Sequence, residues 1–118
     1  MKSTTAFRTA AIVGFLGVAL GAFGAHGLKD TLLKNNTVDV WKTASEYHLI
    51  HAVLLLFLAT LRPLPAVAWM LIFSGVVIFS GSLYLLAVTD MRWLGAITPI
   101  GGLLFLAGWL LFALQPRG

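Results

Sequence analysis

One short stretch holds most of the ionisable side chains that lie next to a long apolar segment. In the nine residues that end at His51, the chain has a carboxylate, Glu46, a phenol, Tyr47, and a second imidazole, His48. The apolar run 52–61 follows directly. Ionisable groups are costly to place inside a membrane and usually mark a functional site there, where they bind a ligand, carry a proton or hold a metal ion.

Helical geometry predicts which of these side chains lie on the same face of the helix. At about 100° per residue, Tyr47 and His51 fall on one stripe of a helix, one turn apart, and can touch. Glu46 lies at the edge of this stripe, too far round the helix to pair with His51. Glu46 and His51 are therefore each expected to find a partner on another helix. The candidates are His26 and the Ser and Tyr side chains of residues 66–88.

His48 lies on the other flank of the same helix and is expected to pack or to face the lipid headgroups. With His26, His51 and Glu46 it could ligate zinc or copper, although an i,i+3 histidine pair is weak evidence for a metal site. His26 and His51 on different helices could also hold a haem. A neutral His51 that only joins two helices through a hydrogen bond would give the same sequence pattern. We therefore predict no metal ion and no cofactor, and keep these sites as alternatives.

Other polar residues are expected at a similar depth in neighbouring helices. With a rise of about 1.5 Å per residue, His51 lies about 12 Å into its span, and Ser80 and Thr98 lie about 12 and 8 Å from the ends of theirs. These ends all face the side of the membrane opposite the termini. The sequence therefore predicts a polar vestibule on one side, which suits binding better than an open pore. Its predicted ligand-binding residues are His26, Glu46, Tyr47, His51, Ser80, Tyr84 and Thr98.

The composition is that of an integral membrane protein. The chain has 118 residues, of which 59% are hydrophobic and 10% charged, and its mean hydropathy is +0.95. An average soluble domain has about a quarter charged residues. The basic residues are scattered singly, so nucleic acid is not an expected partner. The absence of cysteine excludes disulfides, thiolate catalysis and Cys-ligated metal sites.

The apolar runs predict an all-α fold, a single membrane domain over residues 1–118 that forms an antiparallel, up-down four-helix bundle. The expected spans are 9–28, 42–61, 66–88 and 93–114. Trp69 is expected at the membrane interface, where the third span begins. The glycines of the first span are spaced by three or four residues, and we expect them to serve close packing within the chain rather than a dimer.

The positive-inside rule gives no preferred orientation of this chain in the membrane. An even number of spans places four basic residues on the side of the termini and four on the other side, and basic residues are what the positive-inside rule counts. All four acidic residues lie on the side away from the termini. Together with Arg8 at the start of the first span, this favours both termini in the cytoplasm.

The ordered motifs of the chain resemble a known family. They are Gly21-Ala22-Phe23-Gly24-Ala25-His26-Gly27-Leu28, Trp41 with Thr43 and Glu46-Tyr47 to His51, Phe79-Ser80-Gly81-Ser82-Leu83-Tyr84, and Thr98-Pro99-Ile100-Gly101-Gly102 with Gly108-Trp109. In these motifs the chain resembles the domain-of-unknown-function 423 family of small inner-membrane proteins, to which eukaryotic transmembrane protein 256 is similar. The resemblance implies a four-span protein of the bacterial inner membrane and no established activity. His48 lies outside the family pattern, which argues against a metal site built on it.

The leading functional hypothesis is a non-enzymatic membrane protein whose vestibule binds a small ligand, a lipid headgroup or a partner segment. The alternative is a small transporter, proton-coupled and dimeric like the small multidrug-resistance proteins. Those proteins carry a mid-membrane glutamate in their first span, and this chain has no carboxylate there. A metal or haem protein is the third hypothesis. Besides the lipid bilayer, a second copy of the chain or another membrane protein are the expected partners.

Overall fold

The computed structural model describes residues 1–116. Within them every regular element is helical, which confirms the predicted all-α class. The elements are α1 (Ser3–Ala25), α2 (Lys29–Asn35), α3 (Val38–Ala59), α4 (Ala66–Gly75), the π-helical segment η1 (Val76–Ser80), α5 (Gly81–Thr89), the 3₁₀ segment η2 (Arg92–Ala96) and α6 (Thr98–Leu114).

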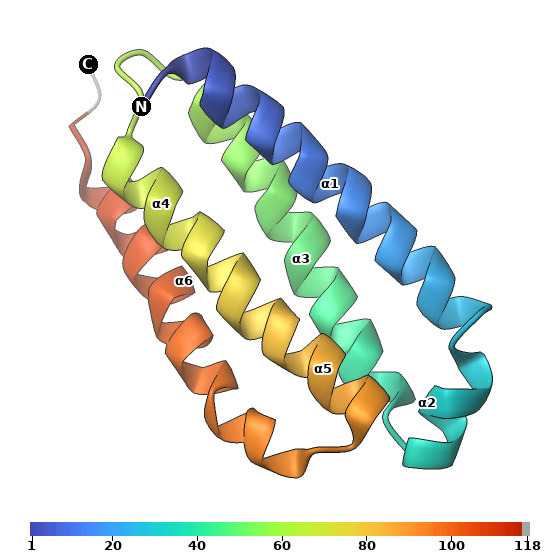
Figure 1. The fold of residues 1–118 in the computed structure, drawn as a ribbon. Helices are drawn as coiled ribbons and strands as arrows, with labels where there is room; N and C mark the ends of the chain where they lie inside the picture. Colours follow the sequence, from blue (N-terminus) through green and yellow to red (C-terminus); the bar gives the residue numbers. More distant parts are fainter. Residues whose placement is uncertain (117–118) are drawn as a thin grey trace.

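The long helices lie side by side along one axis. Figure 1 shows α1, α3, the continuous rod α4–η1–α5 and α6 packed along their lengths, with the N-terminus and the end of α6 at the same end of the molecule. The short α2 and the loop before α6 lie at the other end. The molecule measures 51 × 25 × 19 Å, so its long axis exceeds the hydrocarbon thickness of a bilayer, about 30 Å.

Three helices of the described chain are long and apolar enough to cross a membrane. They are Ser3–Ala25, Ala66–Thr89 and Arg92–Leu114. The helix α3 is not among them, and its first half carries Asp39, Lys42 and Glu46. By these criteria the four predicted crossings become three. The helix α3 begins at Val38, four residues before the predicted start of the second membrane span at residue 42.

The turns follow from residues that tolerate unusual backbone angles. Asn36, after α2, and Asp90, after α5, both adopt the left-handed conformation, with φ of 56° and 59°; short polar side chains tolerate it best after glycine. Thr37 precedes α3 but makes no capping hydrogen bond. Its hydroxyl instead donates to the Ala87 carbonyl at 2.7 Å, which fastens the turn between α2 and α3 to α5.

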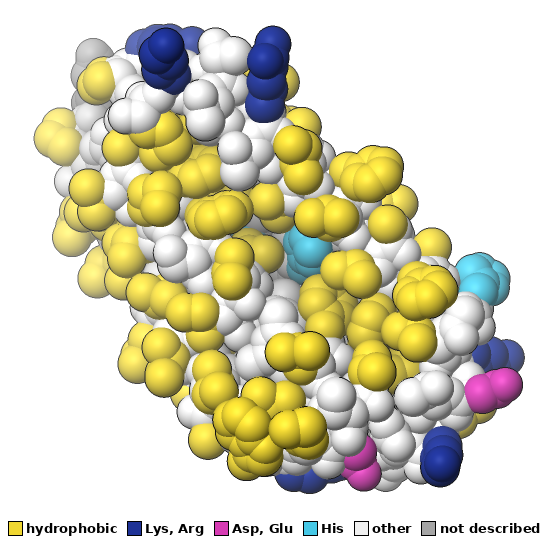
Figure 2. Space-filling view, in the orientation of Figure 1, with side chains coloured by type: hydrophobic (Ala, Val, Ile, Leu, Met, Phe, Trp, Pro, Cys, Tyr) yellow, Lys and Arg dark blue, Asp and Glu magenta, His cyan; other side chains and the backbone are white. Residues whose placement is uncertain are grey.

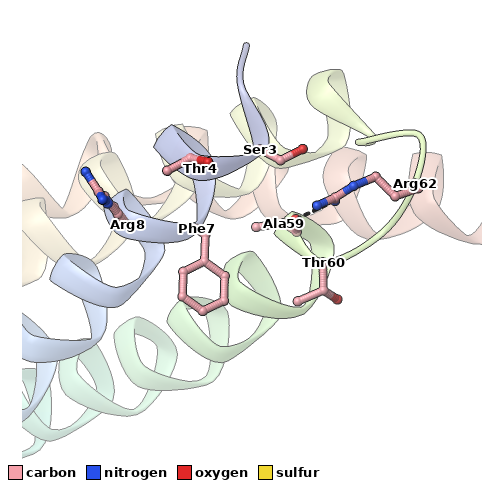
Figure 3. Close-up of a pocket in the computed structure, with 7 residues that line it drawn as sticks. All are labelled: Ser3, Thr4, Phe7, Arg8, Ala59, Thr60 and Arg62. Carbon is pink, nitrogen blue, oxygen red and sulfur yellow. Dashed lines mark hydrogen bonds between the residues drawn. The ribbon is translucent and has the colours of Figure 1, made fainter.

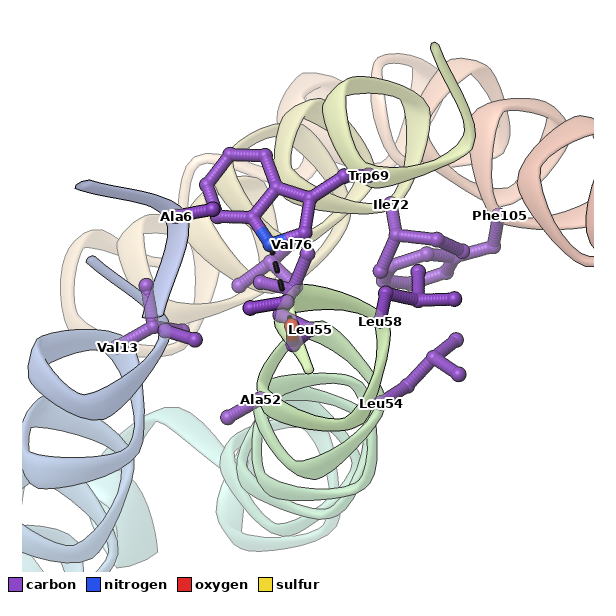
Figure 4. Close-up of a cluster of buried hydrophobic side chains, with 12 residues drawn as sticks. Ala6, Val13, Ala52, Leu54, Leu55, Leu58, Trp69, Ile72, Val76 and Phe105 are labelled. Atoms are coloured by element: carbon purple, nitrogen blue, oxygen red, sulfur yellow. Dashed lines mark hydrogen bonds between the residues drawn. The ribbon is translucent and has the colours of Figure 1, made fainter. Parts of the chain in front are cut away.

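The main hydrophobic core lies in the half of the molecule near the termini. Figure 4 shows it between α1, α3, α4 and α6. Trp69 is only 2% exposed, and its indole donates to the Leu55 carbonyl at 3.1 Å. The prediction of Trp69 as an interface residue is therefore wrong, because α4 turns this side chain inward. The buried members are Ala6, Ala10, Val13, Ala52, Leu54, Leu55, Leu58, Ala59, Trp69, Ile72, Val76 and Phe105.

The π-helical segment η1 packs closely against α6. A Cβ at Gly101 would fall 2.7 Å from the Phe79 Cα, so only glycine permits this contact between α6 and η1. At the end of η1, the Ser80 hydroxyl donates to the Ala44 carbonyl of α3 at 2.8 Å. A π-helical turn widens the helix by one residue and often marks a functional region.

Candidate functional site

His48 joins α1, α3 and α5 through both of its ring nitrogens. The side chain is 5% exposed. Its Nε2 lies 2.8 Å from the Val13 carbonyl, and because a carbonyl only accepts, Nε2 carries the proton. Nδ1 then accepts from the Tyr84 hydroxyl at 2.9 Å. The prediction that His48 packs inside the protein is therefore confirmed. The alternative, that it faces the lipid headgroups, is wrong.

Gly17 makes room for this histidine. It lies one helical turn after Val13 in α1, and a Cβ there would fall 3.1 Å from the His48 Cδ2 and 2.7 Å from the Leu49 Cδ2. A larger residue would separate α1 from α3 and lengthen the hydrogen bond from His48 to Val13. This glycine of α1 faces α3, which agrees with the predicted packing within the chain.

His51 joins α3 to α6. It is 5% exposed, and its Nδ1 donates to the Tyr47 carbonyl at 2.7 Å. Its Nε2 accepts from the Trp109 indole at 3.0 Å. The ring also stacks on Phe105, with centroids 3.8 Å apart and planes inclined by 15°. The predicted partners of His51, His26 or a serine or tyrosine of residues 66–88, are therefore wrong.

Tyr47 extends this aromatic cluster outward. Its ring lies parallel to that of His51, with centroids 6.0 Å apart, so the predicted contact between the two is present. It also lies 4.6 Å from the Phe79 ring and 6.2 Å from the Phe105 ring. Tyr47 is 42% exposed, so it lies at the surface of the cluster.

A groove of about 560 Å³ opens over this cluster, between α3, η1 and α6. Its outer rim is apolar, since Leu103 and Leu106 are 65% and 67% exposed. Such a rim belongs against lipid rather than water. The groove is lined by Tyr47, His51, Phe79, Pro99, Gly102, Leu103, Phe105, Leu106 and Trp109.

A second groove, of about 320 Å³, lies over His48 between α1 and the rod α4–η1–α5. In Figure 2 a histidine side chain is recessed among hydrophobic side chains between these helices. The polar atoms of His48, Ser80 and Tyr84 in this groove hydrogen-bond within the protein. The groove is lined by Val13, Leu16, Leu20, His48, Phe73, Val76, Val77, Ser80, Gly81 and Tyr84.

The remaining predicted site residues do not meet in one vestibule. Thr98 lies 2.7 Å from the Ser82 hydroxyl, where it joins α6 to α5. Tyr84 packs on Trp41, with ring centroids 4.6 Å apart. His26 and Glu46 are exposed. The polar side chains therefore lie on several helix–helix contacts, and His48 and His51 point to different neighbours of α3.

The described residues contain no group of three or more His, Asp or Glu side chains that could hold a metal ion. His26 follows the last residue of α1 and is exposed, whereas His48 and His51 are buried in the middle of α3. Both nitrogens of each buried histidine already have partners in the protein. The structure does not bring the three histidines together, so it gives no geometry for the zinc, copper or haem alternatives.

Sequence reasoning missed the side chains that hold His51. Trp109 and Phe105 lie one turn apart on α6, and only the packing of α6 against α3 brings them to the histidine. The signal that could have suggested Trp109 is its indole N–H, because a tryptophan within an apolar span needs a hydrogen-bond acceptor. His51 is such an acceptor at comparable depth.

Comparison with known proteins places the chain among membrane proteins. Residues 20–102 match the family described as Protein of unknown function (DUF423). The UPF0382 membrane protein SH2409 of Staphylococcus haemolyticus is 45% identical over 109 residues, covering 89% of this chain and 88% of the relative. The UPF0382 membrane protein YwdK of Bacillus subtilis is 44% identical over 108 residues, covering 86% of each chain.

A third relative is named as an inner membrane protein. The UPF0382 inner membrane protein YgdD of Escherichia coli K12 is 43% identical over 109 residues, covering 86% of this chain and 81% of the relative. No solved structure matches the chain. The family match spans most of the chain and the relatives cover nearly all of it, in agreement with the resemblance seen in the sequence motifs. The chain therefore belongs to the DUF423 family of membrane proteins.

Proposed function

We propose that this protein is a non-enzymatic, four-span binding module of the bacterial inner membrane, and that it holds a bilayer-soluble ligand in the groove over His51. The observation that carries the proposal is the fixed aromatic cluster. His51 is held at one end by the Tyr47 carbonyl and at the other by the Trp109 indole, and it is stacked on Phe105. Preorganised rings beside a lipid-facing groove favour binding, because little conformational freedom is lost when a ligand enters.

The helix α3 is the fourth span in this proposal. It has 22 residues, which corresponds to about 33 Å and is enough to cross the hydrocarbon region. Its mid-helix histidines face other helices and not lipid, so their burial in the membrane is compensated by hydrogen bonds. Asp39 and Lys42 lie in its first turns, at headgroup depth. Four spans place both termini on one side, and we assign that side to the cytoplasm.

The groove defines the chemical class of the ligand. Its volume of about 560 Å³ lies within the usual range for small-molecule sites, which are mostly apolar with a few polar groups. Among the described residues, the Tyr47 hydroxyl has no hydrogen-bond partner in the protein. A matching ligand is an apolar, ring-bearing molecule dissolved in the bilayer, with one hydroxyl or carbonyl oxygen for the Tyr47 hydroxyl.

Binding is favoured over proton-coupled transport by the state of the ionisable groups. Both buried histidines use both ring nitrogens for hydrogen bonds within the protein. The four carboxylates, Asp30, Asp39, Glu46 and Asp90, are all exposed. A proton-coupled carrier needs an ionisable group that changes partners along the path, and the described interior contains no carboxylate for that step.

Native mass spectrometry of the protein, extracted from bacterial membranes in mild detergent, tests this proposal. We expect an adduct that leaves on mild activation and is an apolar, ring-bearing compound rather than a phospholipid. Tyr47→Phe should reduce the occupancy of the adduct without changing the stability of the protein, because this hydroxyl has no hydrogen-bond partner among residues 1–116. A wild-type spectrum with phospholipid adducts alone would contradict the proposal.

A further inference from the structure

The positive charge of the chain is concentrated at the end that carries the termini. The net charge is +4, from eight basic and four acidic residues. The four acidic residues lie in the other half, where four basic residues balance them. In Figure 2 the upper end, which carries the start of α1, shows Lys and Arg side chains and no Asp or Glu, while the lower end shows both. Among the described residues, the excess is therefore carried by Lys2, Arg8 and Arg62.

A pocket of about 340 Å³ opens at this positive end, between the first turns of α1 and the end of α3. Figure 3 shows Arg8 and Arg62 on its two sides. The Arg62 guanidinium is anchored, since its Nη1 donates to the Ala59 carbonyl at 3.2 Å and to the Leu61 carbonyl at 3.0 Å. The pocket is lined by Ser3, Thr4, Phe7, Arg8, Ala59, Thr60 and Arg62.

The pocket is amphipathic. The Ser3 and Thr4 hydroxyls lie on the same part of α1 as Arg8, whereas the Phe7 ring points toward α3, away from the start of α1 (Figure 3). Phe7 is 46% exposed, so apolar surface lies directly beside the polar groups. Among the described residues, none that lines the pocket carries a carboxylate that could compete for the two guanidinium groups.

We propose that this pocket binds the phosphodiester group of an anionic phospholipid from the leaflet on the side of the termini. Guanidinium groups bind phosphate oxygens in a fork geometry, and basic pockets between membrane helices bind anionic headgroups. The Ser3 and Thr4 hydroxyls suit the glycerol of the headgroup, and Phe7 suits the first carbons of the acyl chains. This site is separate from the groove over His51 and does not depend on it.

The test is a titration of detergent-solubilised, full-length protein with phosphatidylglycerol and with phosphatidylcholine, followed by native mass spectrometry. We expect preferential binding of phosphatidylglycerol, weakened about fivefold by Arg8→Gln and again by the additional change Arg62→Gln. Lys34→Gln removes the same charge at the opposite end and should change nothing. Arg62 also anchors the turn, so thermal unfolding of each variant is recorded, and Arg62→Lys serves as a second variant that keeps the charge.

Two results of this titration would contradict the assignment of the pocket to an anionic phospholipid. Equal weakening by Lys34→Gln and Arg8→Gln would overturn it, because the effect would then be general charge attraction. Equal binding of the two lipids, with displacement by millimolar inorganic phosphate, would assign the pocket to a free phosphate and contradict a lipid site. Gly102→Phe, which is designed to fill the groove over His51, should leave phosphatidylglycerol binding unchanged. The groove proposal can therefore fail without affecting the proposal for this pocket, and the two failures can be told apart.

Discussion

The indole of Trp109 in α6 donates a hydrogen bond to Nε2 of His51 in α3, at 3.0 Å. Because Nδ1 of the same ring donates to the Tyr47 carbonyl, His51 is a neutral imidazole of defined tautomer. It fixes the spacing of α3 and α6 at the floor of the lipid-facing groove. The same pair is thus both a structural link and part of the proposed binding surface.

Removing the donor of this pair is expected to destabilise the fold. Trp109→Phe leaves Nε2 of His51 without a partner, and we expect a loss of about 1 kcal/mol in the free energy of unfolding. The measurement is reversible unfolding in mixed micelles of mild detergent and dodecyl sulfate. Trp93→Phe is the matched control, since Trp93 is 61% exposed. Equal losses for the two variants would show that the hydrogen bond carries no stability.

The two tyrosines of the chain form a second matched pair. Tyr84→Phe removes the donor to Nδ1 of His48 and should cost about 1 kcal/mol in the same unfolding assay. Tyr47→Phe should cost almost nothing, because its hydroxyl has no partner in the described part of the protein. A greater loss from Tyr47→Phe than from Tyr84→Phe would contradict the assigned hydrogen bonds.

The neighbouring glycines of α6 are expected to respond differently to the same methyl group. At Gly101 a Cβ would meet the Phe79 backbone, whereas at Gly102 the nearest atom is the Phe79 Cδ2 at 4.0 Å. Backbone cannot move aside as a side chain can, so Gly101→Ala should cost about 1–3 kcal/mol. Gly102→Ala should be neutral or slightly stabilising. Similar unfolding curves for both alanine variants would show that α6 does not pack against η1 in this way.

Glu46→Gln tests the transport alternative. Glu46 is exposed on α3, and we expect the variant to match the wild type in stability and in ligand retention. Reconstituted protein should show no proton-coupled uptake in liposomes. Uptake by the wild type that disappears in Glu46→Gln would instead make the protein a carrier and would give Glu46 the role of the proton acceptor.

The helical class and the family could be predicted from composition and motif order, because both are properties of the chain alone. The contact of Tyr47 with His51 could also be predicted, since side chains four residues apart meet on any helix. The partner of His51 could not, because it depends on the rotation of α6 and on the π-helical turn of η1. For those two features the sequence offers no periodic pattern.

The hydrogen-bond partners of His48 could not be predicted, for a different reason. One of its partners is the Val13 carbonyl, and every residue offers a carbonyl, so no residue type identifies it. What singles out Val13 is Gly17 one turn later, which leaves the space that the imidazole fills. His26 was misplaced because α1 ends at Ala25, so His26 lies beyond the helix and outside the packed interior.

The central claim is that the groove over His51 holds a ligand from the bilayer, and a pair of glycine substitutions tests it most directly. Gly102 lines this groove with its nearest obstacle 4.0 Å away, and Gly81 lines the groove over His48 with nothing within 4 Å. Because a Cβ has room at either position, a phenylalanine side chain is expected to project into the groove that its own position lines. In native mass spectra, we predict that Gly102→Phe loses the apolar adduct and that Gly81→Phe keeps it. An adduct that survives in Gly102→Phe, or is lost from Gly81→Phe alone, would contradict this account.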